Sequence, residues 1–422
     1  MVRSLAQWLE YIEQQHPRGI ELGLERTRAV ADRMRIGKPA THVITVGGTN
    51  GKGSTVAFVE AIARSAGWRV GAYTSPHLLR YNERVRIDGV EAEDAQLAAA
   101  FEAVEASRAG IELTYFEFGT LAALWLFRQA GLDLAVLEVG LGGRLDAVNI
   151  VDSDVAVITT VDIDHVEWLG SDRESIGFEK AGIARAWKPL VLGEADSPAS
   201  VLRHAYAIGA NAIRLGSDFF HESIDQERWR WRDIGTALEL PNPKLAAPVQ
   251  QTNAATAIAA LRALAADIPV AAFAEGVAFA AIQARLQRFQ LHDREVVVDV
   301  AHNPQAARAL ASWLQAGPVE GRTLAVFAAL SDKDVVGITV ALAPYVDQWF
   351  LADLDVGSER SQSAGELLEK LLGTAAASGS RHATVAQAIE AAHAISRTED
   401  RILVFGSFHV AAQAMTLLHS AQ

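Results

Sequence analysis

The sequence contains no cysteine among its 422 residues, which excludes disulfides, thiolate catalysis and cysteine metal sites. It also lacks an excess of basic residues, because 38 lysines and arginines stand against 51 aspartates and glutamates. The formal net charge is −13. Since a nucleic-acid-binding surface normally needs a basic patch, this charge argues against nucleic acid as a partner.

No hydrophobic run is long enough to cross a membrane. The most apolar stretch, Leu121 to Leu141, is interrupted by Arg128, Asp133 and Glu138. The start, Met1-Val2-Arg3-Ser4, leads into an amphipathic pattern and lacks the apolar segment of a signal peptide. We therefore expect a cytoplasmic protein without a membrane partner. No exposed apolar helix stands out as an association surface, so we expect a monomer.

The length predicts two domains, and strand-like apolar runs alternate with helical patterns in both halves. This alternation is typical of α/β folds with a mostly parallel sheet. We expect a phosphate-loop ATPase-like domain over residues 1–286 and a smaller, Rossmann-like α/β domain over residues 292–422. The polar segment 285–293 is interpreted as the connection between them. Residues 218–248, with three prolines, suggest a small antiparallel excursion or a loop region.

A glycine-rich segment, GGTNGKGS at residues 47–54, follows an apolar run and precedes a helical stretch. In such a turn the backbone N–H groups and the helix dipole attract phosphate, and Lys52 adds an ammonium group. Ser54 or Thr55 offers a hydroxyl to a magnesium ion carried by the nucleotide. The usual phosphate loop has one more residue before Gly-Lys and a hydroxyl residue directly after the lysine. The alternative is a turn that only joins strand to helix, but three glycines, a lysine and hydroxyl residues favour a nucleotide triphosphate with Mg²⁺.

Polar residues follow three other expected strands at their carboxyl ends. Ser75, Glu138 and His165 lie there, on the same side of the sheet as the phosphate loop. Oxygen donors of this kind suit Mg²⁺, although histidine is an unusual ligand for it. Taken singly, each could equally have a structural role: Ser75 as a turn serine, Glu138 as an ion-paired glutamate and His165 as a hydrogen-bonded core histidine. Lys180, from the same reasoning, is read as an ordinary solvated lysine on a helix.

Six segments closely resemble the folylpolyglutamate synthase and dihydrofolate synthase family, within the Mur-ligase superfamily. They occur in family order and span nearly the whole chain: residues 45–54, 75–85, 137–149, 172–183, 299–304 and 406–409. The resemblance is strongest to the bifunctional bacterial enzymes. It implies an ATP-dependent carboxylate–amine ligase that joins L-glutamate to dihydropteroate, giving dihydrofolate, and to the glutamyl tail of reduced folates. The reaction would pass through an acyl phosphate and serve folate biosynthesis and one-carbon metabolism.

The resemblance also implies roles for individual residues. ATP would contact Thr49, Asn50, Gly51, Lys52, Gly53, Ser54, Asn253, Arg288 and Asp299. The catalytic set would be Lys52, Lys180, His165 and His302, with Lys180 carbamylated and therefore not a solvated lysine. Two magnesium ions would be bound by Ser54, Ser75, Glu138 and His165. The pterin and the glutamate would be bound by Gly19, Ile20, Glu21, Leu22, Thr114, Tyr115, Phe116, Glu117, Leu145, Asp146, Ala147, Arg84, Ser407 and His409.

Two departures from the family pattern are visible. The family usually has Pro-Gly-Arg-Phe-Gln at the domain junction, whereas residues 286–290 here read Leu-Gln-Arg-Phe-Gln. The arginine is retained, but loss of the Pro-Gly turn changes the expected hinge. Phe178 also stands where an arginine is common. Neither change removes a residue with an implied catalytic role.

Other functions fit the sequence less well. A cell-wall ligase of the same superfamily would need an extra domain before the phosphate loop, and the loop begins at residue 47. A phosphate-loop kinase would not need a second domain containing Asp299 and His302. A non-catalytic ATP-binding regulatory protein would be expected to lack several of the implied catalytic residues. A monofunctional folylpolyglutamate synthase remains the alternative within the family.

Overall fold

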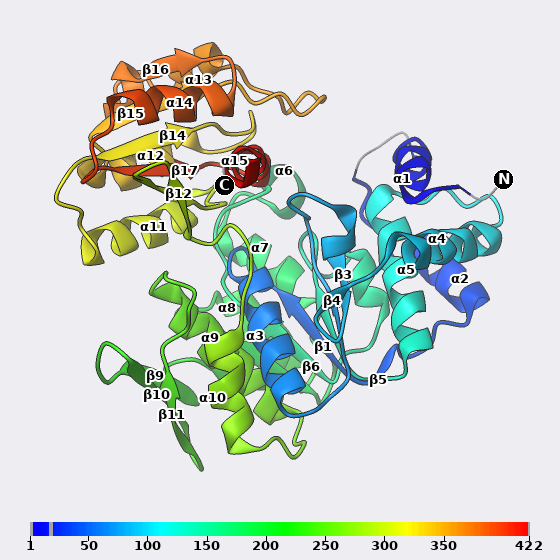
Figure 1. Cartoon of the computed structure of the whole chain (residues 1–422). Coiled ribbons are helices and arrows are strands. Elements are labelled where there is room, and N and C mark those ends of the chain that lie inside the picture. Colours follow the sequence, from blue (N-terminus) through cyan, green and yellow to red (C-terminus); the bar gives the residue numbers. More distant parts are fainter. Residues whose placement is uncertain (1–2, 17–19, 421–422) are drawn as a thin grey trace. The chain divides into compact units, whose positions relative to one another are not determined.

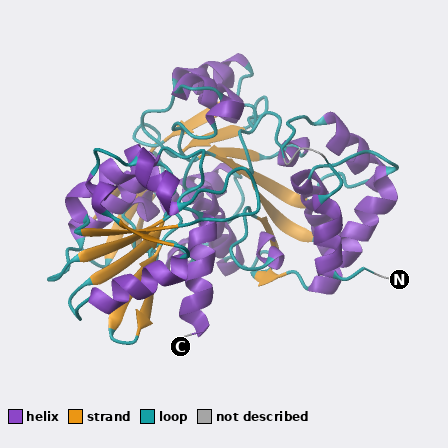
Figure 2. Ribbon diagram, turned by 90° about the horizontal axis from the view of Figure 1, so that it is seen from above, coloured by secondary structure: helices purple, strands orange, loops and turns teal. Residues whose placement is uncertain are grey.

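The computed structural model describes residues 3–16 and 20–420. It divides into two compact units. The first comprises Met1–Lys244 and Gln251–Ala281, and the second comprises Leu245–Gln250 and Ile282–Gln422. Figures 1 and 2 show that each unit is built from a sheet with helices packed against it. Within the described residues, no helix combines the length and the apolar character needed to cross a membrane.

The first unit contains an eight-stranded sheet in the order β4-β3-β2-β5-β1-β6-β7-β8. The six strands from β2 to β8 in this order run parallel, and β3 and β4 are antiparallel additions at one edge. The strands are β1 (Ala40–Gly47), β2 (Val70–Tyr73), β3 (Val85–Ile87), β4 (Val90–Glu91), β5 (Leu132–Glu138), β6 (Val155–Ile158), β7 (Pro189–Leu192) and β8 (Asn211–Arg214).

Helices cover this sheet, and their apolar sides form its core. They are α1 (Leu5–Glu13), α2 (Glu25–Met34), α3 (Lys52–Ser65), α4 (Asp94–Arg108), α5 (Tyr115–Ala130), α6 (Val166–Leu169), α7 (Arg173–Ala181), α8 (Ala199–Ala207), α9 (Val249–Ala263) and α10 (Val270–Phe279). One cluster of buried side chains joins α1, α4 and α5 to the sheet, and another joins α7 and α8 to it. Helix α3 packs along α10, as Figure 1 shows. Burial on both faces explains why β1, β5 and β6 read as continuous apolar runs.

Residues 218–248 contain a three-stranded antiparallel sheet, which confirms the antiparallel excursion expected from the sequence. Its strands are β9 (Phe219–Ser223), β10 (Arg228–Asp233) and β11 (Ala237–Pro241), in the order β11-β10-β9. Trp229 and Trp231 alternate with arginines on β10, which places both indoles on the buried face. The Trp231 indole N–H donates to the carbonyl oxygen of Ala255 on α9, at 3.1 Å.

The second unit contains a six-stranded sheet in the order β12-β13-β17-β14-β15-β16. All neighbours run parallel except β12, which pairs antiparallel with β13. The strands are β12 (Gln287–Leu291), β13 (Arg294–Val298), β14 (Thr323–Phe327), β15 (Gln348–Ala352), β16 (Ser380–His382) and β17 (Arg401–Phe405). The helices are α11 (Pro304–Ala316), α12 (Val335–Leu342), α13 (Ala364–Lys370), α14 (Val385–Ile395) and α15 (Phe408–Ser420).

One part of the sequence interpretation is wrong. The segment 285–293 is not only a polar connection, because Gln287–Leu291 forms strand β12 of the second sheet. Phe289 and Leu291 are buried while Arg288 and Gln290 are exposed, which is the alternation of an edge strand. The two-domain α/β fold with mostly parallel sheets is otherwise as predicted.

Candidate active site

The glycine-rich segment forms the turn between β1 and α3. Helix α3 begins at Lys52, earlier than the sequence pattern indicated, so Lys52, Gly53 and Ser54 lie in its first turn. Within the described structure no side chain caps this helix start. Its first N–H groups therefore suit an anion, as expected for a phosphate cradle. The Lys52 ammonium donates to the carbonyl oxygens of Gly48 and Thr49, at 3.0 and 3.2 Å.

Two glycines of the turn have positive φ angles and very close neighbours. A Cβ atom on Gly48 (φ 144°) would lie 1.9 Å from Thr159 Oγ1. A Cβ atom on Gly51 (φ 86°) would lie 2.6 Å from Oδ1 of Asn253, a buried residue on α9. Both positions thus require glycine, for conformation and for space. The contact also brings Asn253, predicted to bind the nucleotide, against the phosphate loop.

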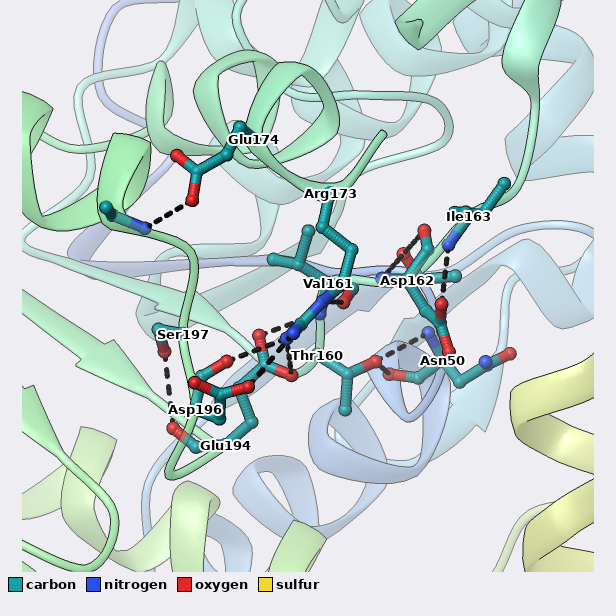
Figure 3. Close-up of polar contacts among 12 residues, drawn as sticks. Asn50, Thr160, Val161, Asp162, Ile163, Arg173, Glu174, Glu194, Asp196 and Ser197 are labelled. Carbon is teal, nitrogen blue, oxygen red and sulfur yellow. Dashed lines mark hydrogen bonds and ion pairs between the residues drawn. The ribbon is translucent and has the colours of Figure 1, made fainter. Parts of the chain in front are cut away.

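The phosphate loop is hydrogen-bonded to the segment that follows β6. The N–H of Thr49 donates to the carbonyl oxygen of Thr160 at 2.8 Å. Thr49 Oγ1 donates to the carbonyl oxygen of Asp162 and accepts from its N–H, both at 3.0 Å. The N–H of Asn50 donates to Thr160 Oγ1 at 3.1 Å (Figure 3). This segment leads to His165, so the loop and the predicted metal ligand are structurally linked.

Of the four predicted metal ligands, the structure shows Ser75 and Glu138 in direct contact. They follow from the neighbouring parallel strands β2 and β5, and the Ser75 N–H donates to Glu138 Oε2 at 3.3 Å. Ser54 is buried at the start of α3. His165 precedes α6 in the left-handed conformation (φ 52°), and its N–H donates to Asp164 Oδ1 at 2.9 Å.

Within the described residues, no group of three or more histidine, aspartate or glutamate side chains could hold a metal ion by itself. A divalent ion here would need hydroxyl and phosphate oxygens beside the Glu138 carboxylate. The phosphate cradle, the buried Ser54 and the Ser75–Glu138 pair provide such a set. Oxygen donors of this kind fit Mg²⁺ carried by a nucleotide.

Lys180 is buried, contrary to its first interpretation as a solvated lysine. It lies near the end of α7 with a relative exposure of 4%. Burial, reinforced by the charge of Lys52, lowers the pKa of Lys180 to about 7. The negative charges of Asp164 and Asp146 act in the opposite direction but are weaker. A substantial fraction of the amine is therefore neutral at neutral pH.

Asp146 is a buried carboxylate on the loop that follows β5. It accepts hydrogen bonds from the N–H groups of Leu141 (2.9 Å) and Val148 (3.0 Å). Burial outweighs these bonds and the charge of Lys52, and raises the pKa of Asp146 to about 6. Asp146 also acts on Lys180. Lys52, Asp146 and Lys180 are thus close enough to influence one another electrostatically.

The predicted pterin residues form one neighbourhood around the start of α5. Thr114 caps this helix, and its N–H donates to Glu117 Oε2 at 2.8 Å. Glu117 also accepts from Arg26 Nη2 (3.0 Å) and Thr27 Oγ1 (3.1 Å), and these contacts occupy its carboxylate. These hydrogen bonds fix the orientation of the Glu117 carboxylate. The Phe116 ring lies against Gly140 and stacks on Tyr73, with 6.0 Å between the ring centroids.

The loop before α2 approaches the same neighbourhood. The N–H of Gly23 donates to the carbonyl oxygen of Leu145 at 3.3 Å, and Glu21 pairs with Arg26. Ile20 and Leu22 belong to this loop, whereas Gly19 lies outside the described residues. Ala147 follows Asp146 and is buried.

Arg84 is nine-tenths buried beside the same helix start. Its Nε atom donates to His77 Nδ1 at 2.8 Å. Its guanidinium carbon lies 5.3 Å from the ring centroid of Tyr81 and 5.5 Å from that of Tyr115. A cation held between aromatic rings in this way can still present N–H groups to a carboxylate.

In the second unit, Asp299 and His302 follow β13. The Asp299 carboxylate accepts from the N–H groups of Leu286 (2.9 Å) and Ala301 (2.8 Å), and burial raises its pKa. His302 Nδ1 lies 2.8 Å from the carbonyl oxygen of Val300. This contact orients the imidazole.

The remaining predicted residues of the second unit are already engaged. Arg288 on β12 forms an ion pair of 3.1 Å with Glu295. Ser407 Oγ accepts from the N–H of Val410 at 3.1 Å, so it stabilises the start of α15. Burial, with a contribution from Arg360, lowers the pKa of His409.

Comparison with known proteins identifies the family. Residues 46–261 match the Mur ligase middle domain, and residues 284–408 match the Mur ligase glutamate ligase domain. The dihydrofolate synthase/folylpolyglutamate synthase of Escherichia coli (strain K12) is 47% identical over 415 residues, covering 98% of this chain and 95% of the relative. The chain belongs to the dihydrofolate synthase/folylpolyglutamate synthase family of Mur ligases. The family and ligase class predicted from the sequence are confirmed.

Solved structures of this family share the fold. A structure of E. coli FolC in complex with DHPP and ADP has a TM-score of 0.93 at 46% identity, covering 99% of this chain and 98% of that one. A bifunctional folylpolyglutamate synthase/dihydrofolate synthase with Mn, AMPPNP and L-glutamate bound has a TM-score of 0.91 at 46% identity, with the same coverage. The predicted two-domain α/β fold is confirmed with them.

Sequence reasoning missed three charged residues of this Mur ligase. Arg285 lies with its guanidinium carbon 5.4 Å from the Phe408 ring, and its charge acts on Asp299. Arg173 and Glu194 contact the segment that leads to His165. For Arg285, its place beside the domain-junction motif was a usable signal. For the other two, no motif distinguished them from surface charges.

Proposed function

We propose that this chain joins L-glutamate to dihydropteroate, giving dihydrofolate, and to the glutamyl tail of reduced folates, using ATP and Mg²⁺. The observation that carries the proposal is the grouping of Lys52, Asp146 and Lys180. The phosphate-loop lysine acts electrostatically on both other residues. Lys52 serves the ATP phosphates, Asp146 the pterin, and Lys180 the metal. A single neighbourhood thus brings together groups suited to nucleotide, pterin and metal.

The chemistry follows from the weakness of a carboxylate as an electrophile, since its negative charge repels an amine. Transfer of the ATP γ-phosphoryl group to the folate carboxylate forms an acyl phosphate with a good leaving group. The amine of L-glutamate then attacks, and phosphate leaves through a tetrahedral intermediate. Lys52 and the N–H groups at the start of α3 stabilise the charge on the transferring phosphoryl group. Exclusion of water protects the acyl phosphate from hydrolysis.

The metal site would be formed by Ser54, Ser75, Glu138 and His165. When bound, two magnesium ions would neutralise phosphate charge and orient the phosphoryl group. We propose that Lys180 is carbamylated, because a buried and partly neutral amine can capture carbon dioxide. The resulting anion would replace a buried cation beside Lys52 with a group of opposite charge, which favours its formation.

Substrate roles are assigned to the other predicted residues. Nucleotide contacts would come from Thr49, Asn50, Gly51, Gly53, Asn253, Arg288 and Asp299, with His302 in the catalytic set. The pterin would be bound by Thr114, Tyr115, Phe116, Glu117, Leu145, Asp146, Ala147 and the loop Ile20–Leu22. Glutamate would be recognised by Arg84, Ser407 and His409. Residues 1–286 would form the ATP- and pterin-binding domain and residues 292–422 the glutamate-ligase domain, in a monomeric, cytoplasmic enzyme.

The experiment that tests the proposal is ATP-dependent incorporation of labelled L-glutamate, with dihydropteroate and tetrahydrofolate supplied separately. Incorporation with both is expected. Incorporation with tetrahydrofolate alone would indicate a monofunctional folylpolyglutamate synthase, the activity named for a Mycobacterium tuberculosis relative that is 30% identical. Incorporation with neither acceptor, despite ATP binding, would contradict the proposal and favour a regulatory protein. Light scattering during size-exclusion chromatography tests the monomer.

A further inference from the structure

Arg173 and Glu194 meet at one residue, Val161, of the segment that leads to His165. Arg173 is the first residue of α7, and Glu194 follows β7. Arg173 Nε donates to the carbonyl oxygen of Val161 at 2.9 Å, and the Val161 N–H donates to Glu194 Oε1 at 3.0 Å. The two side chains also form an ion pair of 3.3 Å. One charged pair therefore holds both backbone polar groups of Val161 (Figure 3).

The opposite side of this segment is fixed to the phosphate loop. Thr49 exchanges two hydrogen bonds with Asp162 and donates its N–H to Thr160, as described above. Residues 160–162 thus lie between the phosphate loop and the Arg173–Glu194 pair. A shift of Val161 would be transmitted to the loop on one side and toward His165 on the other.

Arg173 also connects the segment to the helix that contains Lys180. The two residues are seven positions apart on α7, which is close to two helical turns and places them on the same side of the helix. The first turn of α7 is therefore bound to the His165 segment, while its last turn positions Lys180. If the Arg173 contacts were lost, α7 would no longer be bonded to the His165 segment. His165 and Lys180, the two residues proposed to serve the metal, would then be less firmly positioned relative to each other.

Arg173 is surrounded by acidic groups that depend on its charge. Besides Glu194, its guanidinium contacts Asp196 through Nη1, at 3.1 Å to the carboxylate, and through Nη2, at 2.7 Å to the carbonyl oxygen. Asp162 acts on it electrostatically. Removing this cation would increase repulsion among three carboxylates. The arrangement therefore needs both the hydrogen bonds of Arg173 and its positive charge.

We propose that Arg173 and Glu194 are positioning residues for the ligase reaction, because by holding Val161 they fix the His165 segment relative to the phosphate loop and to Lys180. This inference rests on the proposed function, in which His165 and Lys180 serve the metal. Groups that orient metal ligands typically change metal affinity or activity by about 10- to 100-fold when removed. Substrate contacts remote from the segment should be unaffected.

The test compares Arg173→Met and Glu194→Ala with two conservative variants and one control. Glu194→Gln retains an oxygen acceptor for the Val161 N–H, and Arg173→Lys retains a cation but not the planar donor geometry. The control is Arg203→Met. Arg203 also forms an ion pair with α7, at 3.2 Å to Glu174, but the structure shows it bonded to Glu174 and not to Val161.

Three readouts are measured on the full chain. Hydrogen–deuterium exchange in metal-free protein reports on residues 161–165. Electron paramagnetic resonance reports Mn²⁺ binding in the presence of a non-hydrolysable ATP analogue. Kinetics separate kcat from the KM for glutamate. For Arg173→Met and Glu194→Ala we expect exchange in this segment to be at least about 10-fold faster. Mn²⁺ affinity and kcat should fall about 10- to 100-fold, while the KM for glutamate changes less than about twofold.

Glu194→Gln should recover most of the loss seen in Glu194→Ala, and Arg203→Met should behave as wild type. Unchanged Mn²⁺ binding and exchange in both Arg173→Met and Glu194→Ala would overturn the inference. The inference would also be overturned if Mn²⁺ affinity and kcat fell equally in Glu194→Gln and Glu194→Ala. If Arg173→Met does not fold, the two Glu194 variants decide by the same criteria. The proposed function fails separately, if wild-type protein incorporates no glutamate.

Discussion

The carboxylate of Glu138 accepts a hydrogen bond of 3.3 Å from the backbone N–H of Ser75. Glu138 ends β5, and Ser75 lies just beyond β2, the strand next to it in the parallel sheet. A buried carboxylate is costly unless hydrogen bonds or a cation compensate. Its place at the carboxyl edge of the parallel strands, beside the phosphate loop, suits the proposed role as a ligand of a divalent metal ion.

Glu138→Gln should separate this metal role from a structural one. The amide retains an acceptor for the Ser75 N–H but loses the negative charge. We expect Mn²⁺ affinity, measured with a bound ATP analogue, to fall about 10- to 100-fold while the Tm is maintained or rises. Asp152→Asn is the matched control, since this exposed carboxylate pairs with Arg185. Wild-type Mn²⁺ affinity in Glu138→Gln would contradict the assignment of Glu138.

Lys52→Ala should abolish turnover without unfolding the protein. The ammonium group donates to two carbonyl oxygens of the loop. In the proposed reaction it would stabilise charge on the transferring phosphoryl group. Removing one such group typically lowers kcat by at least about 10² to 10³. Glutamate incorporation and circular dichroism measure the two effects. Lys188→Ala, which removes a surface lysine paired with Asp154, should leave both unchanged. Near-normal incorporation by Lys52→Ala would refute the role of the loop.

The sequence predicts best those features that depend on a short stretch of the chain. The phosphate loop, Ser75 and Glu138 all follow apolar runs, and parallel strands bring such positions to one edge of the sheet. Strand β12 was missed because only two of its five side chains are buried, as is usual for an edge strand.

Contacts that depend on strand order could not be predicted. Arg173 and Glu194 meet at Val161 only because β6 and β7 are neighbours in the sheet. Likewise, the sequence around Lys180 has the composition of an exposed helix, and its burial arises from the packing of α7 against the sheet. The family resemblance pointed to Lys180 as a site residue, whereas the local sequence pattern wrongly predicted that its side chain is exposed to solvent.

Lys180 should make stability depend on pH in a defined window. Its pKa is lowered to about 7 in the folded chain, so between about 7 and 10.5 the unfolded chain binds the extra proton. Stability therefore rises with pH across this window. Lys180→Met should remove that part of the slope and should be more stable than wild type at neutral pH. Urea unfolding in bicarbonate-free buffer between these pH values measures both effects. An unchanged slope would show that Lys180 is not buried as a neutral amine.

Carbamylation of Lys180 predicts a dependence on carbon dioxide. Carbon-13 bicarbonate should produce a carbamate signal in the nuclear magnetic resonance spectrum of wild type, and Lys180→Met should lack it. Activity should fall in carbon dioxide-depleted buffer and return when bicarbonate is added. Lys188→Ala should keep the signal. A wild-type spectrum without a carbamate would refute the modification while leaving the burial of Lys180 intact.

Asp146 should control pterin binding with a pH dependence of its own. Its pKa is raised to about 6, so it becomes ionised as the pH rises through that value. An ionised carboxylate accepts hydrogen bonds from pterin N–H groups, and the KM for dihydropteroate should fall over the same range. Asp146→Asn should flatten this profile and raise the KM about 10- to 100-fold at neutral pH. The KM for ATP should change less than about twofold. Asp133→Asn, at an exposed strand position, is the control.

The same shift has a consequence for stability with the opposite sign from that of Lys180. A carboxylate whose pKa is raised favours the folded state most when it is protonated, below its ordinary value of 3.8. Its contribution is lost as the pH rises to about 6. The free energy of unfolding of Asp146→Asn should therefore fall less than that of wild type as the pH rises between these values. If the stability slope flattens but the KM profile does not, the pH dependence of KM belongs to the pterin; if both flatten, the titrating group is Asp146.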